Sequence, residues 1–353
     1  MHVIRTLLLF FATAASAQQA VIWTELPPLP VPVTNNAVAS IVSHNRTLLF
    51  SMMGMGTGKS YDAITRDAYL FDSQSGQWSP IPHVPGAHGR IAASAVGIAG
   101  HVFLFGGYTV DADGKEVSSS SVDIYTPAKG NPNKGYWAKG VNIPTAIDDS
   151  IAVAYGDRYI VLVSGWSQQD SVNTVQVYDT WRNTWRASTP IPGIPVFGHA
   201  GAATGRMIVY CGGAYKNPAQ GPPRYLASED CWQGKVKYWD GTQIEWKKLP
   251  PHPYFSQYRM AAAEWNHKIV FVGGTSNPYN YNGIGYNGEP SHPSKGVFAW
   301  DTHTELWEQL ASHPHPTMDH RGLIRYQQGL AVIGGMEGDQ KVSARVSLFT
   351  PAN

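Results

Sequence analysis

The chain of 353 residues has little of several features that would assign it to a familiar functional class. Its 26 lysines and arginines nearly balance 25 acidic residues, and no basic run stands out. This argues against nucleic acid or an anionic membrane as a partner, because both are bound through concentrated positive charge. No stretch of the mature chain has an apolar period of 3.6 residues long enough to predict a helix. Helical folds are therefore disfavoured.

Motifs for several common enzyme chemistries are also missing. The chain has no Gly-x-Ser-x-Gly nucleophile elbow. Gly54–Ser60 resembles a phosphate-binding loop, but that pattern needs a glycine where Met53 stands. His313, His315 and His320 lack the spacing of a metal-ligand set, because prolines stiffen the run between them. We expect neither a metal nor a cofactor.

The first 17 residues form an apolar segment with the flanks of a targeting signal. Arg5 supplies the positive start, Leu7–Ala12 the apolar centre and Ala15–Ala17 a cleavage site of small residues. The run is too short to span a bilayer, and no other segment qualifies. We expect residues 1–17 to be a secretory signal peptide. The mature protein, from near Gln18, is then exported to the periplasm or secreted.

A double glycine at the end of an apolar run recurs along the rest of the chain. The intact copies are Gly106-Gly107, Gly212-Gly213, Gly273-Gly274 and Gly334-Gly335. An aromatic residue and then a tryptophan follow, and in four copies six residues separate the two. These pairs are Phe71 and Trp78, Tyr178 and Trp185, Trp239 and Trp246, and Trp300 and Trp307. A unit of roughly 48 to 61 residues therefore repeats, which indicates a repeat architecture.

Each unit has the pattern of four short strands bounded by Gly, Pro, Asn and Asp. In residues 193–251, Ala200–Thr204 turns into Met207–Cys211, and Lys235–Trp239 turns into Glu245–Leu249. The glycine pair lets backbones approach each other near the axis of a radial array. We expect the aromatic residue and the tryptophan to fill the wedge between neighbouring sheets.

This pattern resembles the Kelch repeat, whose units form the four-stranded blades of a β-propeller. The resemblance implies an all-β, six-bladed Kelch-type propeller, with residues 18–353 as a single domain. The expected blades cover about residues 34–82, 83–144, 145–192, 193–251, 252–311, and 312–353 with 20–30. The last unit has no final tryptophan, whereas Val21–Pro28 resembles residues 246–251. An N-terminal strand should therefore complete the last blade and close the ring.

Strand order assigns the connections to two faces of such a propeller. With strands a to d running from the axis to the rim, the b–c and d–a connections emerge on the same face. The b–c connections are long and cover about residues 57–67, 108–121, 214–232 and 275–296. Long loops in a compact fold are often functional, so we expect a ligand to bind on this face.

The d–a connections lead into the innermost strands and ring the mouth of the central channel. Counting back from each glycine pair places six residues there: Asn36, Arg90, Asp149, His199, Arg259 and Arg321. Three converging arginines predict an anion site, because guanidinium groups pair with carboxylates in a bidentate fork. The alternative is that the arginines pair with Asp148, Asp149 and Asp319 and hold the blades together.

The two cysteines are both in the fourth unit. Cys211 ends its second strand, and Cys231 lies near the start of its third. A disulfide is one interpretation in an oxidising compartment, and two separate core residues are the other.

Tyr279, Tyr281 and Tyr286 lie among asparagines and glycines in the loop 277–292 of the fifth unit. Aromatic faces near amides suit sugar rings, which stack through their C–H surfaces while amides bond the hydroxyls. Each tyrosine alone also fits a self-packed loop, but we expect the loop as a whole to contribute to binding.

The chain also resembles the bacterial sialic-acid (N-acetylneuraminate) mutarotases, which are exported six-bladed propellers. The resemblance is strongest at Pro85–Gly107, at Phe197–Ala203 and in the long loop of blade five. It implies cofactor-independent interconversion of sugar anomers. An acid/base group would act on the anomeric hydroxyl while an arginine, here Arg224, holds the sugar carboxylate.

One departure from this family concerns the catalytic group itself. The position of the family's glutamate is Gly213 in this chain. The resemblance therefore keeps the carboxylate-binding half of the site and leaves the acid/base group unassigned. The nearby carboxylates that are candidates to replace it are Glu229, Asp230 and Glu337.

Three functions are compatible with the sequence. The first is an exported mutarotase or epimerase of an acidic sugar such as N-acetylneuraminate, an isomerase without a cofactor. The second is a non-catalytic carbohydrate-binding propeller, and the third is a protein-interaction propeller. The ligand-binding residues that we predict are Asn36, Arg90, Asp149, His199, Arg224, Arg259, Tyr281, Tyr286 and Arg321.

Overall fold

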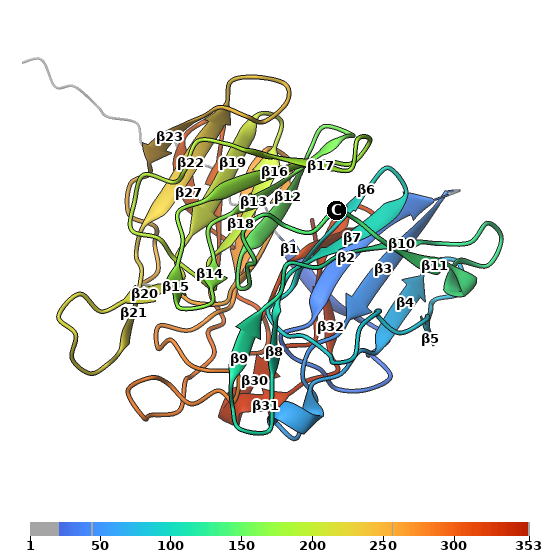
Figure 1. The fold of residues 1–353 in the computed structure, drawn as a ribbon, viewed down its shortest axis with the longest axis horizontal. Coiled ribbons are helices and arrows are strands. Elements are labelled where there is room, and N and C mark those ends of the chain that lie inside the picture. The colour runs from blue at the N-terminus through green and yellow to red at the C-terminus, as the bar shows by residue number, and fades with distance from the viewer. Residues whose placement is uncertain (1–20, 44, 256, 352–353) are drawn as a thin grey trace, which may run out of the picture.

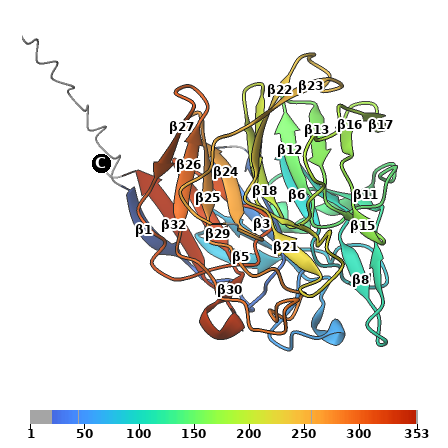
Figure 2. The same ribbon diagram turned by 90° about the vertical axis from the view of Figure 1, so that its left-hand side faces the viewer.

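The computed structural model describes residues 21–43, 45–255 and 257–351. Its strands form six four-stranded sheets arranged around a central axis, and smaller hairpins project from one end (Figures 1 and 2). The predicted all-β, six-bladed propeller is thus confirmed. The expected signal peptide, residues 1–17, lies outside the described residues.

Each blade has four antiparallel strands, which follow one another from the axis outward. Blade one contains β2 (Ala37–Ser43), β3 (Arg46–Met52), β4 (Ala68–Asp72) and β5 (Gln77–Pro80), and blade two contains β6 (Ser94–Ile98), β7 (His101–Phe105), β10 (Val122–Thr126) and β11 (Tyr136–Lys139). Blade three contains β12 (Ile151–Tyr155), β13 (Tyr159–Val163), β16 (Val175–Asp179) and β17 (Thr184–Ala187), and blade four contains β18 (Ala200–Thr204), β19 (Met207–Cys211), β22 (Cys231–Val236) and β23 (Ile244–Lys248). Blade five contains β24 (Ala261–Trp265), β25 (Lys268–Val272), β26 (Val297–Asp301) and β27 (Leu306–Gln309), and blade six contains β28 (Ile324–Tyr326), β29 (Gly329–Ile333), β32 (Val346–Pro351) and β1 (Val21–Leu26).

Shorter elements decorate the connections. Four two-stranded hairpins occupy b–c connections: β8 (Tyr108–Val110) with β9 (Glu116–Ser118), β14 (Trp166–Ser167) with β15 (Asp170–Ser171), β20 (Ala214–Lys216) with β21 (Tyr225–Ala227), and β30 (Met336–Glu337) with β31 (Lys341–Val342). The helical turns are the 3-10 segments η1 (Tyr61–Ala63), η2 (Pro132–Lys134) and η3 (Gly338–Gln340). Within the described ranges, no helix has the length and hydropathy needed to cross a membrane.

The N-terminal strand closes the ring, as predicted. β1 pairs antiparallel with β32 from Val21 opposite Pro351 to Leu26 opposite Val346, and the two strands lie side by side in Figure 2. β1 therefore becomes the outermost strand of blade six. This pairing covers the edge that β32 would otherwise expose.

Tryptophans link each blade to the one before it. The indole Nε1 donates to a backbone carbonyl of the preceding blade, at 2.8 Å from Trp185 to Val141 and at 2.8 Å from Trp307 to Pro250. Trp78, Trp137 and Trp246 make equivalent bonds. Trp23 of β1 repeats this contact with Ala311 at 3.2 Å. β1 thus supplies the tryptophan that the last unit lacks.

The aromatic residue of each pair behaves as predicted except in blade four. Phe71, Tyr178 and Trp300 are buried and lie directly opposite their tryptophans. In blade four, β22 ends at Val236 and Gly234 lies opposite Trp246, where a Cβ would come within 2.6 Å of the indole. Trp239 lies beyond the strand in a turn and is 66% exposed. The prediction that Trp239 fills the wedge is wrong.

The strand ends of blade four are joined covalently. Cys211 of β19 lies directly opposite Cys231 of β22, with 4.1 Å between their Cα atoms, and the two form a disulfide. The bond therefore spans the two ends of the b–c connection that carries β20 and β21. Of the two interpretations of the cysteines, the structure has the disulfide.

Candidate functional site

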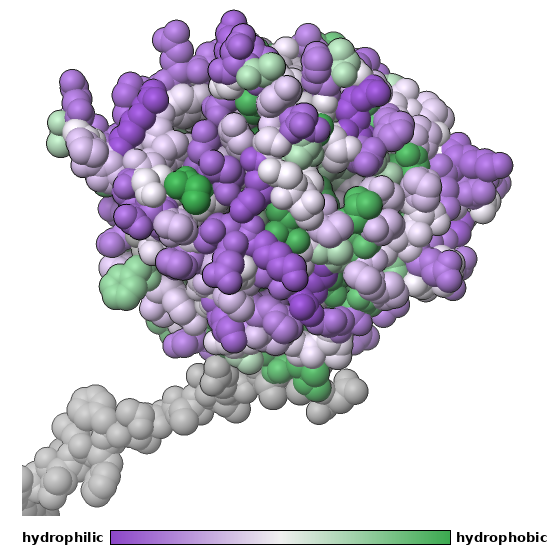
Figure 3. Space-filling model, turned by 90° about the horizontal axis from the view of Figure 1, so that it is seen from below, coloured by the Kyte–Doolittle hydropathy of each residue, from purple (hydrophilic) through white to green (hydrophobic). Residues whose placement is uncertain are grey.

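The long b–c connections gather at one end of the propeller, where β8, β9, β30 and β31 project in Figure 1. We call this end the hairpin face. Figure 3 views it, and hydrophilic side chains cover most of it, with hydrophobic ones gathered in a few places. The candidate site extends from the channel mouth outward to the rim of this face.

A buried ion-pair network closes the channel mouth. Arg259 donates to both carboxylate oxygens of Asp149, at 3.1 Å from Nε and 2.8 Å from Nη2, and from Nη1 to Asp319 at 3.0 Å. Arg321 also donates to Asp149. Burial alone would raise the pKa of Asp149, but the two guanidinium groups outweigh it and lower the pKa. Two arginines are thus balanced by two aspartates from different blades. This is the alternative in which the arginines of the ring hold the blades together.

The other predicted residues of the mouth also have partners inside the propeller. Arg90 pairs with Asp123 at 2.7 Å. Asn36 donates to the Ser51 hydroxyl at 2.8 Å, and His199 Nε2 lies 2.9 Å from the carbonyl oxygen of Val163. These contacts position the innermost strands. The mouth brings together Asp149, Arg259 and Arg321 but leaves little free positive charge for an anion.

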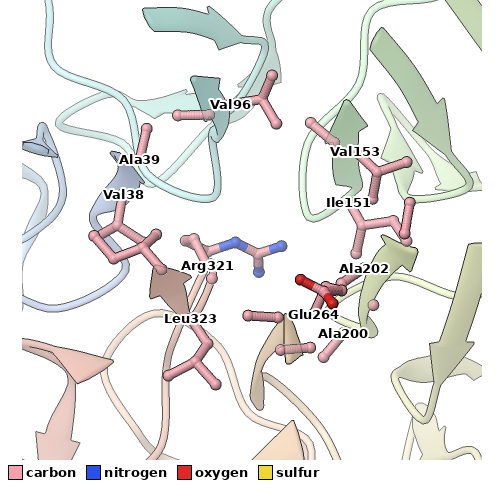
Figure 4. A pocket seen from close by; sticks show the side chains of 18 of the residues that line it. Val38, Ala39, Val96, Ile151, Val153, Ala200, Ala202, Glu264, Arg321 and Leu323 are labelled. Atoms are coloured by element: carbon pink, nitrogen blue, oxygen red, sulfur yellow. The ribbon is translucent and has the colours of Figure 1, made fainter. Parts of the chain in front are cut away.

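The channel beneath the mouth has a mixed lining, in which His199, Glu264 and Arg321 lie among small and apolar residues. Its cavity of about 270 Å³ is lined by small residues of the innermost strands. Figure 4 shows Arg321 and Glu264 pointing into it among residues such as Val38, Val96 and Ile151. This cavity is much smaller than the one on the hairpin face, about 270 Å³ against about 800 Å³, so the larger cavity is the better candidate for a sugar.

A layer of aromatic rings covers the mouth on the hairpin face. Tyr258 packs edge-to-face on Tyr279 at 5.3 Å and on Phe197 at 5.7 Å, and Tyr225 packs on Tyr286 at 4.5 Å. Burial raises the pKa of Tyr258 well above its usual range. Its hydroxyl has no hydrogen-bond partner among the described residues. Tyr279 is fully buried, which fits the interpretation of a self-packed loop. Tyr281 and Tyr286 are half-buried.

Above this layer lies a cavity of about 800 Å³ between the loops of blades four and five. It is lined by Lys216, Asn217, Pro218, Gln220, Gly221, Pro222, Arg224 and Tyr286. Both cations of this lining, Lys216 and Arg224, are exposed. Lys216 lies 3.6 Å from Asp170, and the guanidinium of Arg224 lies 5.2 Å from the ring centre of Tyr225. Arg224 therefore offers a positive charge at the rim, whereas Lys216 already has Asp170 as an ion-pair partner.

Glu116 of β9 is an exposed residue outside the lining of this cavity, but it lies within the electrostatic reach of Arg224, and sequence reasoning missed it. Loss of solvent around its carboxylate raises its pKa, while a hydrogen bond from the Asn280 side chain and the charges of Arg259 and Arg224 act in the opposite direction. Glu116 in turn acts on the pKa values of Tyr225 and Tyr286. A carboxylate from blade two is thus brought among the groups of blades four and five. The only signal in the sequence was its place in the long connection 108–121.

The carboxylates that the sequence offered as candidates lie elsewhere. Glu337 is held by Arg345 at 2.8 Å and by the Ser343 hydroxyl at 2.7 Å, and these contacts lower its pKa although burial opposes them. Glu229 is exposed at the start of β22, and Asp230 pairs with Lys248 at 2.7 Å. Neither Glu337 nor Asp230 has a carboxylate free for a ligand.

Comparison with known proteins supports the interpretation of the repeat. Residues 37–274 match the model of the KLHDC2/KLHL20/DRC7 Kelch-repeats domain. The chain belongs to the Kelch-repeat family. Beta-scruin of Limulus polyphemus is 27% identical to this Kelch propeller over 175 residues, which are 48% of the chain but only 18% of beta-scruin.

Other similar proteins match over most of their length. The N-acetylneuraminate epimerase of Salmonella enteritidis is 22% identical over 93% of this Kelch chain and 90% of its own, and that of Salmonella typhi is equally similar. The solved structure titled "Structure of YjhT" superposes with a TM-score of 0.72 at 17% identity, over 93% of this chain and 97% of that one. At this identity the superposition establishes the fold alone.

Proposed function

We propose that the protein is an exported mutarotase or epimerase of an acidic sugar such as N-acetylneuraminate, acting on the hairpin face without a cofactor. The observation that carries this proposal is the cavity of about 800 Å³ on the hairpin face, which Lys216, Arg224 and Tyr286 border. The carboxylate of Glu116 lies within the electrostatic reach of Arg224, whose charge lowers its pKa against the effect of burial. Distant similarity to proteins named N-acetylneuraminate epimerase supports the substrate class. The fold itself decides nothing, because propellers host many functions.

Lys216 and Arg224, at the rim of the hairpin face, bind the sugar carboxylate in this proposal. Arg224 and Lys216 border one cavity and are exposed, so a carboxylate can pair with Arg224 and compete with Asp170 for Lys216. Tyr286 borders the same cavity and offers an aromatic surface for the sugar ring. The mouth arginines Arg259 and Arg321 are engaged with Asp149 and are better suited to holding this surface in place.

Glu116 provides the acid/base chemistry that Gly213 cannot. Its carboxylate accepts the proton of the anomeric hydroxyl while the bond from the anomeric carbon to the ring oxygen breaks and the ring oxygen takes up a proton from solvent water. Rotation of the resulting carbonyl group and reversal of these steps give the other anomer. A carboxylate whose pKa is raised suits this role, because it is a stronger base when ionised and still donates readily when protonated.

Proton NMR of the exchange between anomers tests this proposal. We expect the wild-type protein to accelerate interconversion of N-acetylneuraminate anomers and Glu116→Gln to lower the rate about 100-fold or more. The wild-type rate should fall as the pH is lowered through a midpoint above 4.5, the ordinary pKa of glutamate, because the ionised base is then lost. Glu116→Gln should remove this dependence.

Asp113→Asn is the matched control, since Asp113 lies at the exposed tip of the same hairpin. It should leave the exchange rate unchanged. Acceleration that persists in Glu116→Gln would contradict the role of Glu116. Calorimetric binding of the sugar without any acceleration by the wild-type protein would instead support a non-catalytic carbohydrate-binding propeller.

A further inference from the structure

Two large aromatic side chains are exposed at the end of the propeller opposite to the hairpin face. Trp181, in the turn between β16 and β17, is 71% exposed, and Trp239, in the turn between β22 and β23, is 66% exposed. Tyr238 beside it is 58% exposed. These three residues and Arg158, in the turn between β12 and β13, form what we call the aromatic patch.

Side chains of the patch contact one another and the propeller core. The guanidinium carbon of Arg158 lies 4.7 Å from the ring centre of Trp181, 5.7 Å from that of Trp239 and 5.0 Å from that of buried Tyr159. The ring of Trp239 also packs on Tyr159 at 5.6 Å. Arg158 thus lies between the two indoles and joins them across the boundary of blades three and four.

Hydrogen bonds fix the turns that carry both tryptophans. Asp179 is buried, holds Arg158 through two hydrogen bonds and accepts the backbone N–H of Trp181 at 3.1 Å. On the other side, Ser188 donates to the carbonyl of Gly241 at 2.6 Å, across the boundary between the blades. Both indoles are therefore presented on ordered backbone, which lowers the entropic cost of binding to them.

Trp239 does not lie opposite the tryptophan of strand d, and its contact with Tyr159 leaves it 66% exposed. In blades three and five the residue of strand c opposite the tryptophan of strand d is a buried aromatic, whereas blade four places Gly234 there. The indole of Trp239 is left to solvent in a position where a polar residue would serve a simple turn equally well.

The surroundings of the patch favour a sugar over a protein partner. Arg182, Asn183 and Lys237 next to the indoles are exposed and polar, so no continuous apolar area of the kind found at the centre of a protein interface is present among these described residues. Isolated flat rings bordered by hydrogen-bonding groups fit pyranose rings, whose C–H faces stack while their hydroxyls bond the border.

The charges of the patch favour a neutral sugar. Arg158 is paired with Asp179, Arg186 with Asp240 at 3.1 Å, and Lys237 with Glu245. These three basic side chains are paired with carboxylates, and Arg182 is the basic residue beside the indoles without such a partner among the described residues. We propose that the aromatic patch is a second carbohydrate site, separate from the hairpin face, that binds a chain of neutral pyranose units stacked on Trp181 and Trp239.

Native affinity electrophoresis of the full mature protein tests this site. The gels contain hydroxyethyl cellulose, laminarin or xylan as neutral polymers, and polysialic acid as the acidic one. At least one neutral polymer should retard the protein, and Trp181→Ala and Trp239→Ala should each lower the apparent affinity about tenfold. Polysialic acid should give no retardation that depends on these tryptophans.

Phe255→Ala is the matched control, because Phe255 is 82% exposed and lies outside the patch. It should leave retardation unchanged, and circular dichroism should show that all three variants are folded. Retardation that survives the double tryptophan variant, or no retardation by any neutral polymer, would overturn the proposal. A dimer that Trp181→Ala dissociates would overturn it as well. Because Glu116 lies at the other end, Glu116→Gln should bind the neutral polymer normally whether or not the protein is an isomerase.

Discussion

At the scale of single residues, Gly213 explains why the resemblance to the mutarotases stops at the catalytic group. Its φ is +88°, and an ideal Cβ would lie 2.9 Å from the Phe197 carbonyl oxygen and 3.0 Å from the backbone nitrogen of His199. Its N–H donates to the Gln257 carbonyl at 2.8 Å and so ties blade four to blade five. This backbone leaves no room for a glutamate side chain, which is why the proposed acid/base group is assigned elsewhere.

Gly213→Ala should therefore be much more destabilising than an ordinary glycine substitution. Gly288→Ala is the matched control, since Gly288 has φ +85° with nothing within 4 Å of its ideal Cβ. We expect Gly288→Ala to lower the free energy of unfolding by about 1 kcal/mol and Gly213→Ala by about 1–3 kcal/mol more. Urea denaturation measures both, and equal losses would show that the close backbone contact is not limiting.

The residue scale also shows what the sequence could not predict about the site. The sequence predicts Asp149, Arg259 and Arg321 at the channel mouth, because each precedes an innermost strand, and the structure brings the three side chains together. Their mutual pairing depends on side-chain directions across the channel, between residues 110 and 172 positions apart in the chain. Glu116 could not be recognised either, since only the fold of the hairpin β8–β9 brings it toward Arg224.

At the scale of elements, the strands followed from glycine pairs and turns, and blade four shows where this reasoning failed. The pattern predicted a strand at Lys235–Trp239, but β22 covers Cys231–Val236. The spacing predicted a turn at Asp240-Gly241. In the structure the turn begins earlier, and the backbone N–H of Lys237 donates to the Gln243 carbonyl. Trp239 had the spacing of a core residue without the partner strand that would bury it.

The disulfide of blade four gives a prediction at this scale. Cys211 and Cys231 are 20 positions apart and enclose the connection that carries Lys216 and Arg224. Replacing both by alanine should lower the free energy of unfolding by about 3 kcal/mol, chiefly because the unfolded chain gains freedom. Chemical denaturation measures this loss.

A reductant provides the control for the cysteine variant. Dithiothreitol in the denaturation buffer should lower the stability of the wild-type protein by a similar amount and leave the variant unchanged. Equal stability of the two proteins in oxidising buffer would contradict the prediction.

At the scale of the whole molecule, the blade number and the closure by β1 were predictable because they depend on periodicity alone. The last unit lacks a final tryptophan and the N-terminal segment has one, so the two together predict a single complete blade. The structure adds the physical reason, since Trp23 makes the same inter-blade bond as the other tryptophans. The repeat pattern cannot show which blades carry the functional residues, because it is the same in every blade.

Buried histidines make the stability of the whole propeller depend on pH. Burial, with the charge of Arg321, lowers the pKa of His199 to about 3, and burial lowers that of His252 to about 4. His313 and His320 are shifted in the same direction, mainly by burial. Above pH 6.5 these groups are neutral in both states. Below it the unfolded chain takes up protons that the folded propeller excludes, so the free energy of unfolding should fall steadily from pH 6.5 toward pH 4.

His252→Phe tests this coupling in a single site. His252 stacks on Phe298 with 4.9 Å between ring centres and an interplanar angle of 6°, so a phenylalanine can occupy its place. Relative to the wild type, the variant should lose about 3 kcal/mol less stability between pH 6.5 and pH 4, because one proton-binding group is absent from the unfolded chain. Thermal and urea denaturation across this range measure the difference. His292→Asn, at an exposed position, should keep the wild-type dependence, and a wild-type slope in His252→Phe would show that His252 does not contribute to the acid sensitivity of the fold.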